Sequence, residues 1–124
     1  MDSPAALFRL MEFEIEGHRR KVAQIQTMIA DFERLAADLD REIRIEQDRT
    51  GNHDPAHFAY STYAKAAMRR RDNLKRSAAG LKSQLDAASK ALAEATAEFE
   101  TQAQAAGPEQ THAAPASAGF SQAS

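Results

Sequence analysis

The side chains with the greatest chemical capacity in this chain are its histidines. His53 and His57 stand four residues apart, a spacing that on one helix would suit two ligands of a metal ion. They lie on either side of Asp54-Pro55, a helix-start signal, so they do not share a helical face, and the chain has no Cys to complete a metal set. We therefore predict no metal and no cofactor, and we expect both histidines to cap a helix end or to lie in a solvated turn.

Closely spaced carboxylates are the second candidate for chemistry. Asp31/Glu33 and Asp38/Asp40 are each two residues apart, which on a helix turns the two groups away from each other. General acid-base catalysis needs such groups to converge on one substrate, and the sequence has no phosphate-binding glycine loop or nucleophile elbow beside them. We predict a protein that is not an enzyme, with these carboxylates on a solvated face.

An aromatic-basic stretch, residues 58–76, is the strongest candidate for a binding site. It contains both tyrosines, one phenylalanine and a dense run of cations. Aromatic residues and arginines dominate the energetic centres of protein interfaces, so an acidic protein partner fits this segment. The alternative is a solvated face whose charges pair across helices, for example Lys75 with Glu33. The residues that we predict to contact a partner are Phe58, Tyr60, Tyr63, Lys65, Arg69, Arg70 and Arg71.

Composition narrows the class of protein. The 124 residues allow one small domain, and the abundance of Ala, Glu, Lys, Arg, Leu and Gln favours long helices. A net charge of -2 argues against a general affinity for nucleic acid. The absence of Cys fits a reducing compartment, and no stretch approaches the roughly 20 apolar residues of a membrane span. We expect a soluble cytoplasmic protein.

Two apolar seams with heptad spacing define the elements that must position the aromatic-basic stretch. A strict seven-residue repeat places its members on one face of a helix, and that face needs a partner. The sequence therefore predicts an all-α fold: two long helices that form an antiparallel coiled-coil hairpin. The first seam is Phe8, Met11, Ile15, His18, Val22, Ile25, Ile29, Phe32, Ala36, Leu39 and Ile43, and the second is Tyr60, Ala64, Ala67, Arg71, Leu74, Ala78, Leu81, Leu85, Ala88, Leu92, Ala95 and Phe99.

Start and stop signals set the expected boundaries. Ser3 with Pro4, and Asp54 with Pro55, are typical of a cap followed by the first helical residue. Gly51 and Gly107-Pro108 are typical of helix ends. These signals predict helices at about 4–49 and 55–105, a turn at residues 50–54, a hairpin domain over residues 1–106 and a disordered tail over residues 107–124.

Side-chain volumes suggest how the two helices are aligned. In one register large residues face small ones: Phe8 faces Ala95, and Ile25 faces Ala78. This register places Arg71 on the seam. A second register, offset by seven residues, also gives good pairs but moves the centre of the turn to Pro55. We predict the first.

Residues 54–66, Asp-Pro-Ala-His-Phe-Ala-Tyr-Ser-Thr-Tyr-Ala-Lys-Ala, resemble the start of the second helix in the FliJ family of flagellar export proteins. The alphaproteobacterial branch is the most similar. Residues 19–39 and the run Arg-Arg-Asp-Asn-Leu at 70–74 are similar to the same branch, so the resemblance covers roughly residues 7–100. Ser61 stands where that pattern has proline, and an Ala/Gln/Ser-rich tail replaces a charged end.

The resemblance implies a non-enzymatic component of the flagellar type III protein export apparatus, and so a role in flagellum biogenesis, motility and chemotaxis. The family forms a cytoplasmic coiled-coil stalk that links the export ATPase ring to the export-gate cytoplasmic domain and assists export chaperones and subunits. It implies these partners for this chain, no nucleic acid, and association with the membrane only through partners. The expected location is the cytoplasm or the cytoplasmic face of the inner membrane.

Two other functions remain open on sequence alone. One is a generic coiled-coil adaptor or chaperone that is unrelated to export, because heptad seams are common to many such proteins. The other, less favoured by the net charge, is a nucleic-acid binder that uses the cations of the aromatic-basic stretch.

Overall fold

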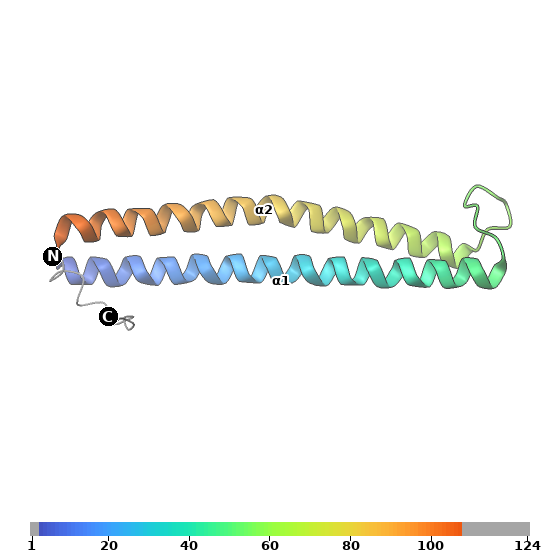
Figure 1. Ribbon diagram of the computed structural model, residues 1–124, viewed down its shortest axis with the longest axis horizontal. Helices are drawn as coiled ribbons and strands as arrows, with labels where there is room; N and C mark the ends of the chain where they lie inside the picture. Colours follow the sequence, from blue (N-terminus) through green and yellow to red (C-terminus); the bar gives the residue numbers. More distant parts are fainter. Residues whose placement is uncertain (1–2, 108–124) are drawn as a thin grey trace. The chain divides into compact units, whose positions relative to one another are not determined.

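The computed structural model describes residues 3–107. Within these residues the chain forms two α-helices, α1 (Pro4–Thr50) and α2 (Thr62–Ala106), and no strand (Figure 1). The two helices pack against each other, which confirms the predicted all-α fold. The predicted disordered tail lies, apart from Gly107, outside the described residues. No helix within residues 3–107 is long and apolar enough to cross a membrane.

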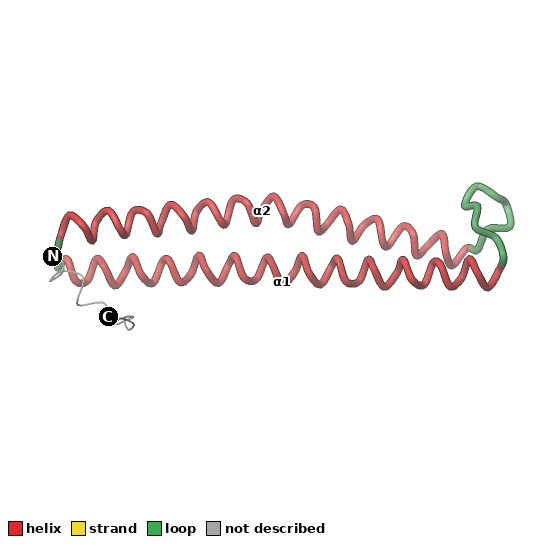
Figure 2. The backbone as a smooth tube through the Cα atoms, in the orientation of Figure 1, coloured by secondary structure: helices red, strands yellow, loops and turns green. Residues whose placement is uncertain are grey.

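The chain divides into two compact units, which we call the terminal unit (Met1–Ala23 with Asp86–Ser124) and the turn unit (Gln24–Leu85). Each unit contains a segment of α1 and a segment of α2, because both helices run through both units. The turn unit also contains the loop that joins the helices, drawn in green in Figure 2. The turn unit is thus a helical hairpin.

In the terminal unit, the start of α1 packs against the end of α2. The Ser3 hydroxyl accepts the Ala6 backbone N–H at 3.1 Å, so Ser3 caps α1 as predicted and Pro4 occupies the first helical position. Phe8 is buried, and its ring meets Phe99 edge to face with centroids 5.7 Å apart. The helix segments of this unit are therefore antiparallel. Gly107, with φ of 87°, ends α2 in the left-handed conformation expected of it.

In the turn unit, the core lies between the two helices near the loop. Leu39, Ile43 and Ala67 are buried together, with Met68 and Leu74 packed against them. α1 ends at Thr50, and the next residue, Gly51, has a φ of 73° and an N–H that bonds the Gln47 carbonyl at 2.8 Å, so the predicted glycine stop is confirmed.

The heptad seams are confirmed along their length. Every residue of both seams is buried or half-buried, including His18 and Arg71, whose side chains can carry a charge. Ile25 and Leu81, one from each seam, are 5% and 8% exposed. The periodic pattern therefore identifies the faces along which the helices pack.

The predicted start of the second helix at residue 55 is wrong, because α2 begins at Thr62. Asp54 caps only a single turn of the loop. The Asp54 carboxylate accepts the Ala56 N–H at 3.0 Å, and the Asp54 carbonyl accepts the His57 N–H at 3.0 Å. A second cap then starts the helix, because the Ser61 hydroxyl accepts the Ala64 N–H at 3.1 Å. The loop consequently spans residues 51–61 rather than 50–54.

The predicted register is also wrong: the ion pair of Glu33 in the turn unit is displaced by seven residues and the contact of Phe8 in the terminal unit by four. Glu33 pairs with Lys82, seven residues beyond the predicted Lys75, with Nζ and Oε2 3.0 Å apart. Phe8 meets Phe99 rather than Ala95. This alignment is close to the second register considered above, and the longer loop explains it, since a turn centred near Pro55 moves the start of α2 along the chain.

Candidate partner-binding surface

Side chains of the loop itself hold residues 51–61 in place. The Asn52 carboxamide oxygen accepts the Asp54 N–H at 3.0 Å, and Nε2 of His53 lies 3.0 Å from an Asp48 carboxylate oxygen. Nδ1 of His57 accepts the Ala59 N–H at 3.0 Å. Both histidines therefore build the turn, and the residues that the structure describes contain no cluster of three or more His, Cys, Asp or Glu side chains suited to a metal ion.

Phe58 lies in this loop and is 95% exposed. Its ring stacks on His57 with centroids 4.7 Å apart and an interplanar angle of 24°. A phenylalanine so exposed contributes little to folding, because it removes almost no apolar area from water. Of the three aromatic residues among the predicted contact residues, it is the most exposed.

Tyr60 is the exception among the predicted contact residues, because it is only 5% exposed. Its hydroxyl accepts a hydrogen bond from the Gln47 carboxamide at 2.7 Å and approaches the Met68 sulfur at 3.7 Å. The prediction that Tyr60 contacts a partner conflicts with this burial. Tyr60 instead fastens the end of the loop to α1 as the first residue of the second seam.

Tyr63 is half exposed on the first turn of α2 and is joined to α1. Its hydroxyl donates to a Glu42 carboxylate oxygen at 2.6 Å. This hydrogen bond, with the charge of Glu42 beside it, raises the pKa of the Tyr63 phenol above its ordinary value. Its outer face remains accessible to a partner.

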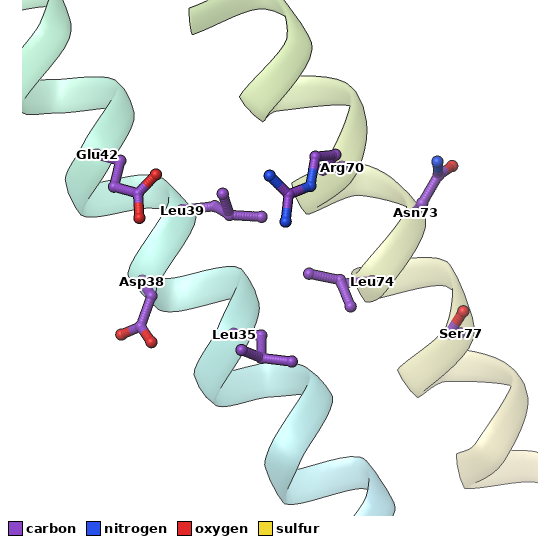
Figure 3. Close-up of a pocket in the computed structure, with 8 residues that line it drawn as sticks. All are labelled: Leu35, Asp38, Leu39, Glu42, Arg70, Asn73, Leu74 and Ser77. Carbon is purple, nitrogen blue, oxygen red and sulfur yellow. The ribbon is translucent and has the colours of Figure 1, made fainter. Parts of the chain in front are cut away.

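A groove of about 410 Å³ lies between the two helices of the turn unit (Figure 3). Leu35, Leu39 and Leu74 form its apolar part, and Arg70 extends from α2 towards α1, where Glu42 stands on the opposite wall. The groove is thus apolar at its base with charges of both signs at its rim. Such a surface can accept an apolar side chain or a helix of another protein.

Arg71 is half-buried, and two carboxylates neutralise it. Its guanidinium lies 3.0 Å from an Asp40 carboxylate oxygen and 3.1 Å from one of Asp72. The hydrogen bond to Asp40 is the main reason why the pKa of Arg71 is raised above its ordinary value. Arg71 therefore bridges the two helices, and this pairing leaves little of its charge for a partner.

Glu46 ties the end of α1 to the start of α2. Its carboxylate pairs with Arg49 at 2.9 Å and accepts the Ser61 hydroxyl at 2.6 Å. These two hydrogen bonds, that of Arg49 first, lower the pKa of the Glu46 carboxyl below its ordinary value. Ser61 thus caps α2 and contacts α1 with the same hydroxyl group.

Three of the predicted contact cations remain unneutralised. Lys65, Arg69 and Arg70 are exposed, and none of them forms an ion pair with another residue of the described range 3–107. On the facing part of α1, Asp38 pairs with Arg41, and Asp40 pairs with Arg71. Glu42 accepts a hydrogen bond from Tyr63, and Glu46 pairs with Arg49. The start of α2 therefore presents three cations without an ion-pair partner among residues 3–107, and the Glu42 carboxylate keeps its own charge across the groove from Arg70, because the Tyr63 hydroxyl is neutral.

The sequence interpretation missed the acidic residues that complete this surface. Glu42 and Glu46 were not singled out, and Ser61 was noted only as a departure from the family pattern, although it stands directly before a helix-forming run, which is a recognisable cap signal. The other expected solvated carboxylates, Asp31 and Glu33, pair with cations on the surface.

No protein-family model, curated protein or solved structure matches this chain.

Proposed function

We propose that this protein is a non-enzymatic component of the flagellar type III export apparatus, a coiled-coil stalk that links the export ATPase to the export-gate cytoplasmic domain. The proposal rests on the resemblance of residues 54–66 and of the flanking helical segments to the FliJ family. The helical hairpin of the turn unit is compatible with a stalk.

Beside the resemblance, the observation that supports the proposal is the group of three exposed cations without an ion-pair partner at the start of α2, among residues 3–107. Lys65, Arg69 and Arg70 form no ion pair within residues 3–107, so their charges are free to meet those of another protein. Exposed charges of this kind contribute little to stability but steer a partner of opposite charge and fix its orientation. The assigned contact surface is this cationic start of α2 with the neighbouring Phe58 and Tyr63.

The test is direct binding of the purified chain to the export ATPase and to the export-gate cytoplasmic domain from the same organism. We expect binding to both, and we expect Arg69→Ala with Arg70→Ala to weaken gate binding and motility without a change in melting. Because the attraction is electrostatic, the difference between wild type and variant should be larger at low salt.

The matched control removes two exposed positive charges that also lack an ion pair within residues 3–107: Arg44→Ala with Lys75→Ala, one on each helix of the turn unit. If neither purified protein binds the wild-type chain, the export function is wrong and an adaptor unrelated to export replaces it. If both double variants weaken binding equally, net charge rather than this surface is responsible.

A further inference from the structure

Phe58 differs from the other exposed apolar side chains in where it stands. It is 95% exposed, whereas the next most exposed large apolar residue within residues 3–107, Phe13, is 68% exposed and lies on a helix. An aromatic ring on a loop usually finds cover against its own protein, since burial of its area is favourable. Here only the His57 ring covers it, at 4.7 Å between centroids.

The loop fixes the backbone on both sides of Phe58. The His57 N–H bonds the Asp54 carbonyl, and the Tyr60 N–H bonds the His57 carbonyl, both at 3.0 Å. The loop then ends at buried Tyr60 and at Ser61, which is bonded to Glu46. Phe58 is therefore held away from the helices by turns whose ends are anchored.

The His57 ring is itself held by two donors. Nδ1 accepts the Ala59 N–H at 3.0 Å and lies 3.3 Å from the Asn52 carboxamide nitrogen. Both contacts need an unprotonated Nδ1, so the ring presents its faces rather than this edge. One face of the ring meets Phe58.

We propose that Phe58 is the anchor by which this turn binds a pocket on an acidic protein, and that His57 is the positioning residue that holds it for entry. The inference deepens the proposed function and rests on it in taking a protein as the partner of this surface. The pocket is apolar and accepts the Phe58 ring. Its rim carries Asp or Glu side chains that face Lys65, Arg69 and Arg70.

The cations beside Phe58 favour an acidic protein as the partner over an uncharged apolar surface. Lys65 and Arg69 stand one and two helical turns into α2, directly after the loop, and have no ion-pair partner within residues 3–107. A protein that receives Phe58 approaches this cationic start of α2, where carboxylates gain the most. A loop backbone that is already held by hydrogen bonds loses less conformational freedom on binding, which favours affinity.

The anchor is tested by photocrosslinking in cells that carry the gene, with Phe58→p-benzoylphenylalanine and, as the matched control, Phe13→p-benzoylphenylalanine. We expect a discrete protein adduct from position 58 that position 13 does not give. Mass spectrometry of the crosslinked peptide should place the contact in an apolar pocket with Asp or Glu at its rim. No adduct at position 58, the same adduct at position 13, or a contact site without carboxylates would each overturn the inference.

The identity of the adduct separates this inference from the proposed function. An adduct with the export gate or the export ATPase supports both. An adduct with another protein whose contact site is acidic supports the anchor and overturns the export function. With the identified protein, Phe58→Ala should weaken binding about 30-fold, as truncation of a central aromatic anchor does, and Phe13→Ala should not.

The positioning role of His57 is tested by two variants that divide its functions. His57→Asn keeps an acceptor near the position of Nδ1 but removes the ring, and His57→Phe keeps a ring but removes the acceptor. We expect the Ala59 amide to stay protected from hydrogen exchange in His57→Asn and to lose protection in His57→Phe, with unchanged melting in both. Each variant should bind the partner more weakly than wild type and more tightly than Phe58→Ala; wild-type binding by both would overturn the role of His57.

Discussion

Replacement of Ile43 by Ala tests the core of the turn unit against a control of the same residue type on the same helix. Ile43 is 4% exposed and packs in the core, whereas Ile45, two residues further along α1, is 66% exposed. The comparison holds chemistry and helix constant and changes burial alone.

The expected loss of stability follows from these exposed fractions. Ile→Ala removes three carbons, about 2.4 kcal/mol of transfer free energy when fully buried. The higher helix propensity of alanine stabilises the folded state by about 0.4 kcal/mol relative to isoleucine. Ile43→Ala should therefore cost about 2 kcal/mol, near the lower end for buried aliphatic truncations, because a two-helix core is open to water at its sides. Ile45 is only about one-third buried, so Ile45→Ala loses about 0.8 kcal/mol of transfer free energy and gains the same ~0.4 kcal/mol of helix propensity. The expected net loss of stability is about 0.4 kcal/mol.

Urea unfolding followed by circular dichroism at 222 nm measures both values, with the denaturant slope checked for equality among the three proteins. Equal losses from the two substitutions would refute the assignment of the seam face, since burial then fails to distinguish the residues. A changed slope in Ile43→Ala would indicate that the native state, and not only its stability, has changed.

Three further predictions concern polar contacts. The pKa of the Glu46 carboxyl lies below its usual 4.5, so its stabilisation is present above pH 4.5 and lost as the pH falls through the folded value; wild-type melting should therefore fall more steeply below pH 4.5 than that of Glu46→Gln. The pKa of the Tyr63 phenol lies above its usual 10.0, so its stabilisation is present below pH 10 and lost as the pH rises through the folded value; Tyr63→Phe should lack this alkaline loss in a melting series. Zero-length carbodiimide coupling followed by mass spectrometry should join Glu33 to Lys82, 3.0 Å apart, and not to Lys75; predominant coupling to Lys75 would contradict the observed register.

The fold could be predicted from the sequence, but the alignment of the helices could not. A heptad repeat identifies which face of each helix is apolar, yet it looks the same after a shift of seven residues. Loop length decides between such registers, and the loop contains two competing cap signals, Asp54 and Ser61. The Ser61 hydroxyl also bonds Glu46, a contact between segments that local sequence does not reveal.

The candidate site was predictable in composition but not in exposure. Phe58, Tyr63, Arg69 and Arg70 are exposed, and their role as partner contacts stays a prediction. Tyr60 belongs both to the aromatic-basic stretch and to the second apolar seam. Because it is buried and its hydroxyl is hydrogen-bonded to Gln47, it acts as a core residue of the seam.

The hydrogen bonds at the loop have a consequence for the order in which the chain folds. Gln47 to Tyr60 and Glu46 to Ser61 join residues only 13 and 15 apart in sequence, whereas Phe8 and Phe99 must meet across most of the chain. Closing a short loop loses less chain entropy than closing a long one, so contacts at the loop should form first. We expect substitutions at Ser61 to slow folding and substitutions at Phe99 mainly to speed unfolding. The residues that start α2 would thus also start the assembly of the protein.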